Sequence, residues 1–228
     1  MLYDNALLAL AYLEAYQVTQ KSFYAQVARE IFTYLLRDMQ APDGGFASAE
    51  DADSEGGEGR HYTWRRDQVC AVLGNEEAEL FTRYFDITRK GNFGTGLKIP
   101  NLLGSKAGTL RIAGRRTEER TESDNADSSY DAEDMLIQAC ARLLEARTKR
   151  PRPFRDDKVL TAWNGLAVTA FARGGRVLGE HEYVDVAADT ADFVLTTLRR
   201  SDGRLLARYR KGEAAIPAYL DDYAFFIR

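Results

Sequence analysis

The stretch WNGLAVTAFA, residues 163–172, is apolar on nearly every side when read as a helix, which is typical of a helix buried on most sides. The stretch ALLALAYL, residues 6–13, has the same character. A shift of 159 residues superposes the two without a gap, and the match extends over residues 2–46 and 161–205. The superposed pairs include Asn5 with Asn164, Leu7 with Leu166, Ala11 with Ala170, Tyr24 with Tyr183, Ala28 with Ala187, Leu36 with Leu195, Asp43 with Asp202 and Gly44 with Gly203. The chain therefore contains an internal repeat.

Each copy of the repeat continues with an amphipathic helix. Its apolar positions follow helical spacing, at Tyr24, Val27, Ala28, Ile31, Phe32 and Leu35 in the first copy and at Tyr183, Val186, Ala187, Ala191 and Val194 in the second. An Asp-Gly turn and a short extended stretch end each copy, which predicts a hairpin or lid. We therefore predict an all-α fold. It is an incomplete (α/α) toroid, in which amphipathic outer helices wrap apolar inner helices and the loops carry short β-hairpin or extended insertions.

We predict that residues 1–228 all belong to one domain, which is part of this toroid. Residues 65–86 have a short helical pattern, and an irregular insertion is expected at about 87–130. The acidic stretch at 118–134 is predicted to be a solvated surface loop that leads into a helix at 131–150.

Composition limits the class of partner and the cell compartment. With 31 Lys and Arg against 35 Asp and Glu, the net charge is −4, and no basic patch interleaves with aromatic residues, so nucleic acid is not an expected partner. No apolar run is long enough to span a bilayer, so we expect no membrane association and a cytoplasmic location. Cys70 and Cys140 lack ligand spacing and are predicted to be buried apolar residues. No cofactor is predicted.

The stretch GGFASAEDADSEGGEGRHYTW, residues 44–64, concentrates negative charge between glycines. Asp51, Asp53 and Glu55 fall at positions one, three and five of an EF-hand loop, but Tyr62 stands where the closing Glu should be. We therefore predict no EF-hand and assign no metal ligands. A weaker interpretation, in which this loop gathers a divalent cation, stays open.

Toroid topology would bring several loops to one pole, where the inner helices begin. The polar and aromatic residues of these loops are then candidates for binding a sugar, since ring faces pack on aromatic rings while carboxylates and amides bind hydroxyls. The candidate substrate-binding residues are Asp51, Asp53, Glu55, Glu58, His61, Trp64, Asp156, Lys158, Trp163, Asn164, Asp221 and Tyr223. Asp157 and Asp222 are the candidate catalytic residues, as a general acid and base. Helix capping explains Asp4, Asn5, Asp221 and Asp222 equally well, taken one at a time.

Five stretches resemble one known family. They are MLYDNALL, GGFASAEDADSEGGEGRHYTW, GNFGTGLKIPNLL, RPFRDDKVLTAWNGLAV and YLDDYAFF, and together they are similar to the YyaL-type, spermatogenesis-associated thioredoxin-domain proteins. The resemblance implies a six-hairpin (α/α) region, related to glycosidases and sugar 2-epimerases, that follows a thioredoxin-like domain. We expect this chain to lack that domain and to contain only part of the ring.

Two functions follow from these observations. The first is binding or processing of a carbohydrate-like ligand at the acidic mouth, with glycosidase-like or epimerase-like chemistry if the chain is an enzyme. The alternative is a non-catalytic binding or structural module that contacts a thioredoxin-like domain.

Overall fold

The computed structural model describes residues 1–94, 96–101 and 126–227, and at 126–131 and 133 it describes the backbone only. The chain divides into two compact units. Unit 1 comprises Met1–Glu50 with Arg155–Arg228, and unit 2 comprises Asp51–Phe154. Much of the insertion expected at about 87–130, and the acidic stretch up to residue 125, lie outside the described residues.

The prediction of an all-α fold is wrong. The described residues contain eight α-helices and seven short strands in three small antiparallel sheets, so the fold is mixed α/β. The strands are β1 (Ala49–Glu50), β2 (Asp53–Ser54), β3 (Gly57–Glu58), β4 (Arg155–Asp156), β5 (Val159–Leu160), β6 (Leu206–Arg210) and β7 (Glu213–Pro217). Most are two residues long, too short for an alternating pattern to show in the sequence. Strands form in segments that were expected to be short β-hairpin or extended insertions in the loops.

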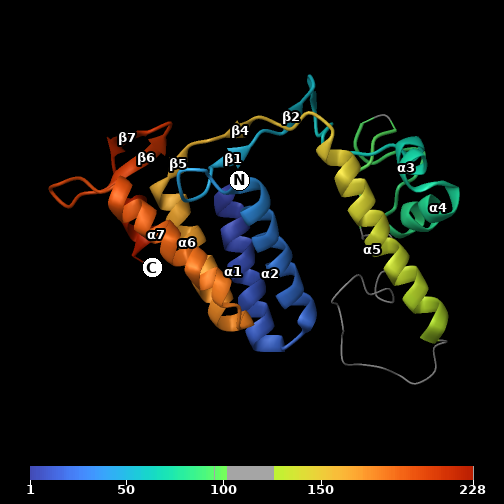
Figure 1. Cartoon of the computed structure of the whole chain (residues 1–228), viewed down its shortest axis with the longest axis horizontal. Coiled ribbons are helices and arrows are strands. Elements are labelled where there is room, and N and C mark those ends of the chain that lie inside the picture. The colour runs from blue at the N-terminus through green and yellow to red at the C-terminus, as the bar shows by residue number, and fades with distance from the viewer. Residues whose placement is uncertain (95, 102–125, 228) are drawn as a thin grey trace. The chain divides into compact units, whose positions relative to one another are not determined.

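Unit 1 consists of two helical hairpins and one further short helix. Its helices are α1 (Leu2–Thr19), α2 (Ser22–Tyr34), α6 (Thr161–Leu178), α7 (His181–Thr197) and α8 (Leu220–Phe226), and a π-helical turn at Leu35–Met39 extends α2. The long apolar helices α1 and α6 pack on each other, α2 covers α1, α7 covers α6, and α8 packs on α6 (Figure 1).

The 159-residue offset seen in the sequence also relates the bounds of the helices. Helices α1 and α6 begin and end at equivalent positions, and the residues that follow them, Gln20 and Gly179, are both left-handed, with φ of 55° and 75°. The turns after the outer helices match as well, because the bridge between Gln40 and Phe46 is equivalent to the bridge between Arg199 and Leu205.

Aromatic rings fill the core between the hairpins. The Phe171 ring on α6 stacks on Phe46 at 5.3 Å and lies 4.6 Å from Phe32 on α2. A β-carbon on Gly174 would come within 2.6 Å of the Phe32 ring, so α6 needs a glycine where this ring crosses it. These contacts bury the apolar faces that the sequence pattern predicts.

Unit 2 is inserted at the tip of a β-hairpin. The β-hairpin that follows α7 pairs Arg208 with Ala215 and Tyr209 with Ala214, between β6 and β7. Strands β1 and β4 form the equivalent ladder after α2, with Ala49 opposite Asp156 and Glu50 opposite Arg155. The turn between β6 and β7 is only Lys211 and Gly212, whereas unit 2 separates β1 from β4. Without the 104 residues of unit 2, the 159-residue offset falls to 55, close to the 59 residues between the starts of α6 and α8.

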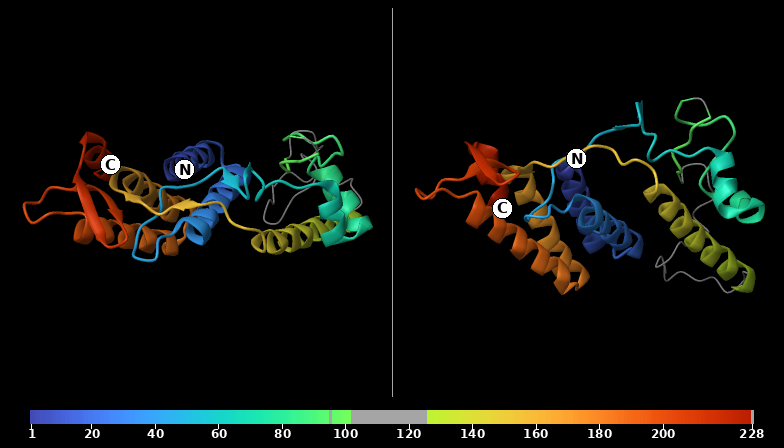
Figure 2. Two further views of the ribbon diagram at one scale, coloured as in Figure 1. Left: turned by 90° about the horizontal axis from the view of Figure 1, so that it is seen from above. Right: turned by 45° about the horizontal axis from the view of Figure 1, so that its top comes forward.

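Unit 2 has its own core around α5 (Ala126–Thr148). Helices α3 (Arg66–Leu73) and α4 (Asn75–Tyr84) pack on α5, and the views in Figure 2 show the same neighbours. Val69, Phe81 and Leu136 are among its buried residues. The backbone of α5 is helical from residue 126, five residues before the predicted start of this helix.

Replacing Asn164 should destabilise the fold strongly. Its buried amide accepts the Phe46 N–H at 2.8 Å and donates to the Phe46 and Leu160 carbonyls, so Asn164→Ala would remove these three hydrogen bonds, including both bonds to the buried backbone of Phe46. We expect a loss of about 2–4 kcal/mol in the free energy of unfolding, measured by chemical denaturation.

The matched control is Asn5→Ala at the equivalent position of α1. The Asn5 amide makes one exposed hydrogen bond, to the Met1 carbonyl at 2.8 Å, so we expect a loss below about 1 kcal/mol. Equal losses at the two positions would contradict the special role of Asn164.

Candidate functional site

Asp222, predicted to be catalytic, is held by the starts of two helices. One carboxylate oxygen accepts the Ala162 N–H in the first turn of α6 at 2.9 Å, and the other accepts the Tyr219 N–H at the start of α8 at 2.8 Å. The residue is 4% exposed. Burial raises the pKa of this carboxyl, and the two backbone hydrogen bonds oppose that shift. The side chain joins α6 to α8 as a double cap.

Asp157, the other predicted catalytic residue, forms an ion pair with Arg210 on β6. Its neighbour Asp156 lies 3.0 Å from the Lys158 ammonium, so two predicted site residues do meet here. Burial alone would raise the pKa of Asp156, but hydrogen bonds from Lys158 and Ser48 hold it below its usual range. Each of these carboxylates already has a cationic partner.

The remaining predicted residues of unit 1 serve the packing of its helices. The Tyr223 hydroxyl accepts the Leu205 N–H at 3.0 Å, the same role that Asn164 plays toward Phe46 in the first hairpin. Half-buried Trp163 packs edge to face with Tyr3 at 4.8 Å. Asp221 is exposed in the first turn of α8, where a carboxylate favours the helix dipole.

The candidate acids of the 44–64 stretch lie in unit 2, on or next to a small hairpin. Strands β2 and β3 pair Asp53 with Glu58, and the turn between them places Glu55 and Gly56 at φ of 51° and 73°. Asp51 accepts the Asp53 N–H at 3.3 Å. In the part of the chain that the structure describes, no three His, Cys, Asp or Glu side chains are grouped to hold a metal ion, so the cation interpretation gains no support.

His61 and Trp64 are buried, which makes them poor platforms for a ligand. The Arg150 guanidinium donates to the carbonyls of Arg60, His61 and Thr63, at 3.3, 3.1 and 2.7 Å. It also lies over the Trp64 ring, 3.8 Å from its centroid. Trp64 is 5% exposed, and the His61 Nδ1 atom lies 3.1 Å from the Pro151 carbonyl. Arg150 thus holds the backbone of residues 60–63, a role that the sequence did not indicate.

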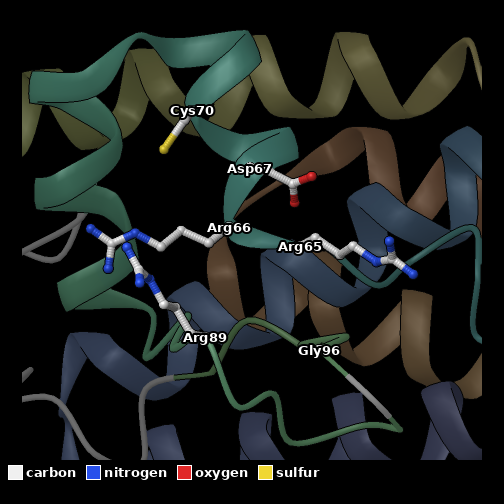
Figure 3. Close-up of a pocket in the computed structure, with 6 residues that line it drawn as sticks. All are labelled: Arg65, Arg66, Asp67, Cys70, Arg89 and Gly96. Carbon is white, nitrogen blue, oxygen red and sulfur yellow. The ribbon is translucent and has the colours of Figure 1, made fainter.

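Sequence reasoning also missed a cavity of about 590 Å³ in unit 2 (Figure 3). It is lined by Arg65, Arg66, Asp67, Cys70, Arg89 and Gly96. A second hollow of about 350 Å³ shares Arg66 and Arg89 with it. These arginines come from the start of α3 and the segment after α4, so no basic run in the sequence marks them. The adjacent pair Arg65 and Arg66 was the one feature of the sequence that could have pointed to this cavity.

Comparison with known proteins supports the resemblance that the motifs indicated. The whole chain matches human spermatogenesis-associated protein 20 at 34% identity over 253 residues, and its mouse counterpart at 33% over 252 residues. The chain is homologous to a segment of spermatogenesis-associated protein 20. An uncharacterized protein of Caenorhabditis elegans also matches the whole chain, at 29% identity. No family model matches the chain.

The match with spermatogenesis-associated protein 20 covers all of this chain but only 32% of the human and mouse proteins. The chain therefore spans about a third of the length of these relatives, and their names state no reaction or ligand. Among the described helices, none combines the length and the apolar character that crossing a membrane requires.

Replacing Asp222 should cost stability, because two helix starts lose their cap. We expect Asp222→Ala to lower the free energy of unfolding by about 1–3 kcal/mol. The pKa of Asp222 is raised in the folded state, so its contribution should be greatest in acid and fall as the pH rises through that pKa. Denaturation at about pH 4 and pH 7 measures both effects. Asp221→Ala is the adjacent exposed control, and a loss as large as that of Asp222→Ala would contradict the capping role.

The two cysteines of the chain should react at different rates. Cys70 lines the arginine cavity, whereas burial raises the pKa of the Cys140 thiol to about 11. At pH 8 only about one Cys140 thiol in a thousand would be ionised. We expect iodoacetamide to label Cys70 before Cys140, and the labelling of Cys140 to become faster as the pH is raised toward 11. Peptide mass spectrometry measures both rates. Faster labelling of Cys140 at pH 8 would contradict this assignment.

Proposed function

We propose that this chain is a non-catalytic structural and binding module, in which unit 1 is a helical scaffold that docks another protein domain. The carrying observation is the occupation of both Asp222 oxygens by backbone N–H groups. A glycosidase needs two carboxyl groups that face a sugar, one to protonate the leaving oxygen and one to act as base or nucleophile. Asp222 is 4% exposed and its carboxylate faces the starts of α6 and α8, and Asp157 is paired with Arg210.

The partner named in this proposal is a thioredoxin-like domain. The resemblance implies such a domain in the family, and the human and mouse relatives are about three times as long as this chain. Exposed apolar side chains on α1, Leu7 and Leu8, are 44% and 51% exposed and offer a surface for contact with another domain. The proposal also places the protein in the cytoplasm.

A thermal-shift screen with neutral sugars and amino sugars tests the absence of sugar processing. A ligand at one hundred times its dissociation constant adds about 2.7 kcal/mol of stability, which the screen would detect. We expect no shift with any sugar. The proposal fails if one sugar class raises the melting temperature and Asp157→Asn removes that shift without changing stability. Asp185→Asn, an exposed acid on α7, controls for a general effect of lost charge.

A further inference from the structure

Two arginines of unit 2 lie in the same surroundings. Arg66 and Arg89 both line the 590 Å³ cavity and the adjoining 350 Å³ hollow, and Glu79 and Asp86 also line the hollow. Figure 3 shows their side chains directed toward each other, with Cys70 on the same side. Among the described residues, no carboxylate forms an ion pair with either of them. Both residues are exposed, and two neighbouring positive groups attract an anion.

Several other cationic residues of unit 2 have a partner in the unit. Arg142 pairs with Glu77 at 2.6 Å, and Arg150 is held by three carbonyls. The acid closest in sequence to Arg89 is Asp86, but buried Lys98 bonds it at 2.9 Å. The hydrogen bond from Lys98 holds the pKa of Asp86 below its usual range, so this carboxylate is already engaged.

The one carboxylate that lines the larger cavity lies on its other side. Figure 3 shows Asp67 directed to the side of Arg65, away from the guanidinium groups of Arg66 and Arg89. The cavity therefore has a mixed side, with one positive and one negative group, and a side where two positive groups meet. An anion would bind at the second side.

We propose that Arg66 and Arg89 bind the phosphate group of a small phosphorylated ligand. Guanidinium groups donate paired N–H bonds that match the oxygens of phosphate, and two of them together neutralise a dianion. A cavity of about 590 Å³ is within the range of small-molecule sites, which is about 300–1,000 Å³. The net charge of −4 disfavours a long polyanion such as nucleic acid, so a small ligand fits better.

The inference is separate from the proposed function. It concerns residues of unit 2 alone, and phosphate binding can be present or absent whatever the screen with neutral sugars shows.

Calorimetric titration of the full chain with inorganic phosphate tests the proposal. We expect one phosphate per chain, with Arg66→Gln and Arg89→Gln each weakening the affinity by at least about tenfold, because each removes a charged hydrogen-bond donor. Lys90→Gln is the matched control: it removes the same charge beside Arg89 at an exposed residue that lines neither hollow, and should change the affinity less than about twofold.

Protection of Cys70 gives a second readout that needs no variant. Because the Cys70 thiol lines the cavity, bound phosphate should slow its alkylation, whereas the same ionic strength of sodium chloride should not. Absence of both binding heat and protection overturns the proposal. Equal weakening by Lys90→Gln would reduce the effect to general attraction, and equal affinity for acetate would overturn the choice of phosphate.

Discussion

The buried amide of Asn164 fixes the junction between the two helical hairpins of unit 1. It holds both backbone polar groups of Phe46, the residue that follows the Asp-Gly-Gly turn, and it also caps the Leu160 carbonyl. Phe46 then stacks on Phe171, so one side chain positions both a turn and a core ring. Tyr223 repeats the arrangement one hairpin later, because its hydroxyl accepts the Leu205 N–H. The first turns of α6 and α8 therefore each hold one of the two equivalent turns, and a buried polar group of this kind is costly to leave without a partner.

This junction explains how unit 1 accommodates an insertion of 104 residues. The ladder between β1 and β4 keeps the ends of unit 2 paired, and the Asp51 N–H donates to the Phe154 carbonyl at 2.8 Å just beyond it. Insertions are tolerated at exposed turns because the backbone there makes few contacts that must be broken. In the second hairpin the same place is a two-residue turn. Unit 1 thus needs only the paired strands at this place, and the length of chain between the two strands can vary.

The helices were predictable because their pattern repeats over many residues, whereas the strands and the site were not. The apolar stretches at 6–13 and 163–172 fall within α1 and α6, and the 159-residue offset persists in the structure. The all-α prediction failed because two-residue ladders have no period, and Ala49 finds Asp156 only after the chain returns. The role of Asp222 was equally hidden. An acid near a helix start is either a cap or a reactive group, and only its hydrogen bonds distinguish the two.

Charged residues near helix starts therefore have to be judged by their partners. Asp157 and Asp222 attracted attention in the sequence, yet the structure gives the first a cation and the second two N–H groups. Arg66 attracted none, although it also opens a helix and shares a cavity with Arg89. A helix start favours an anion, so an arginine placed there gains nothing from the dipole and keeps its donors available. The two arginines thus direct the search for a ligand from sugars toward phosphates.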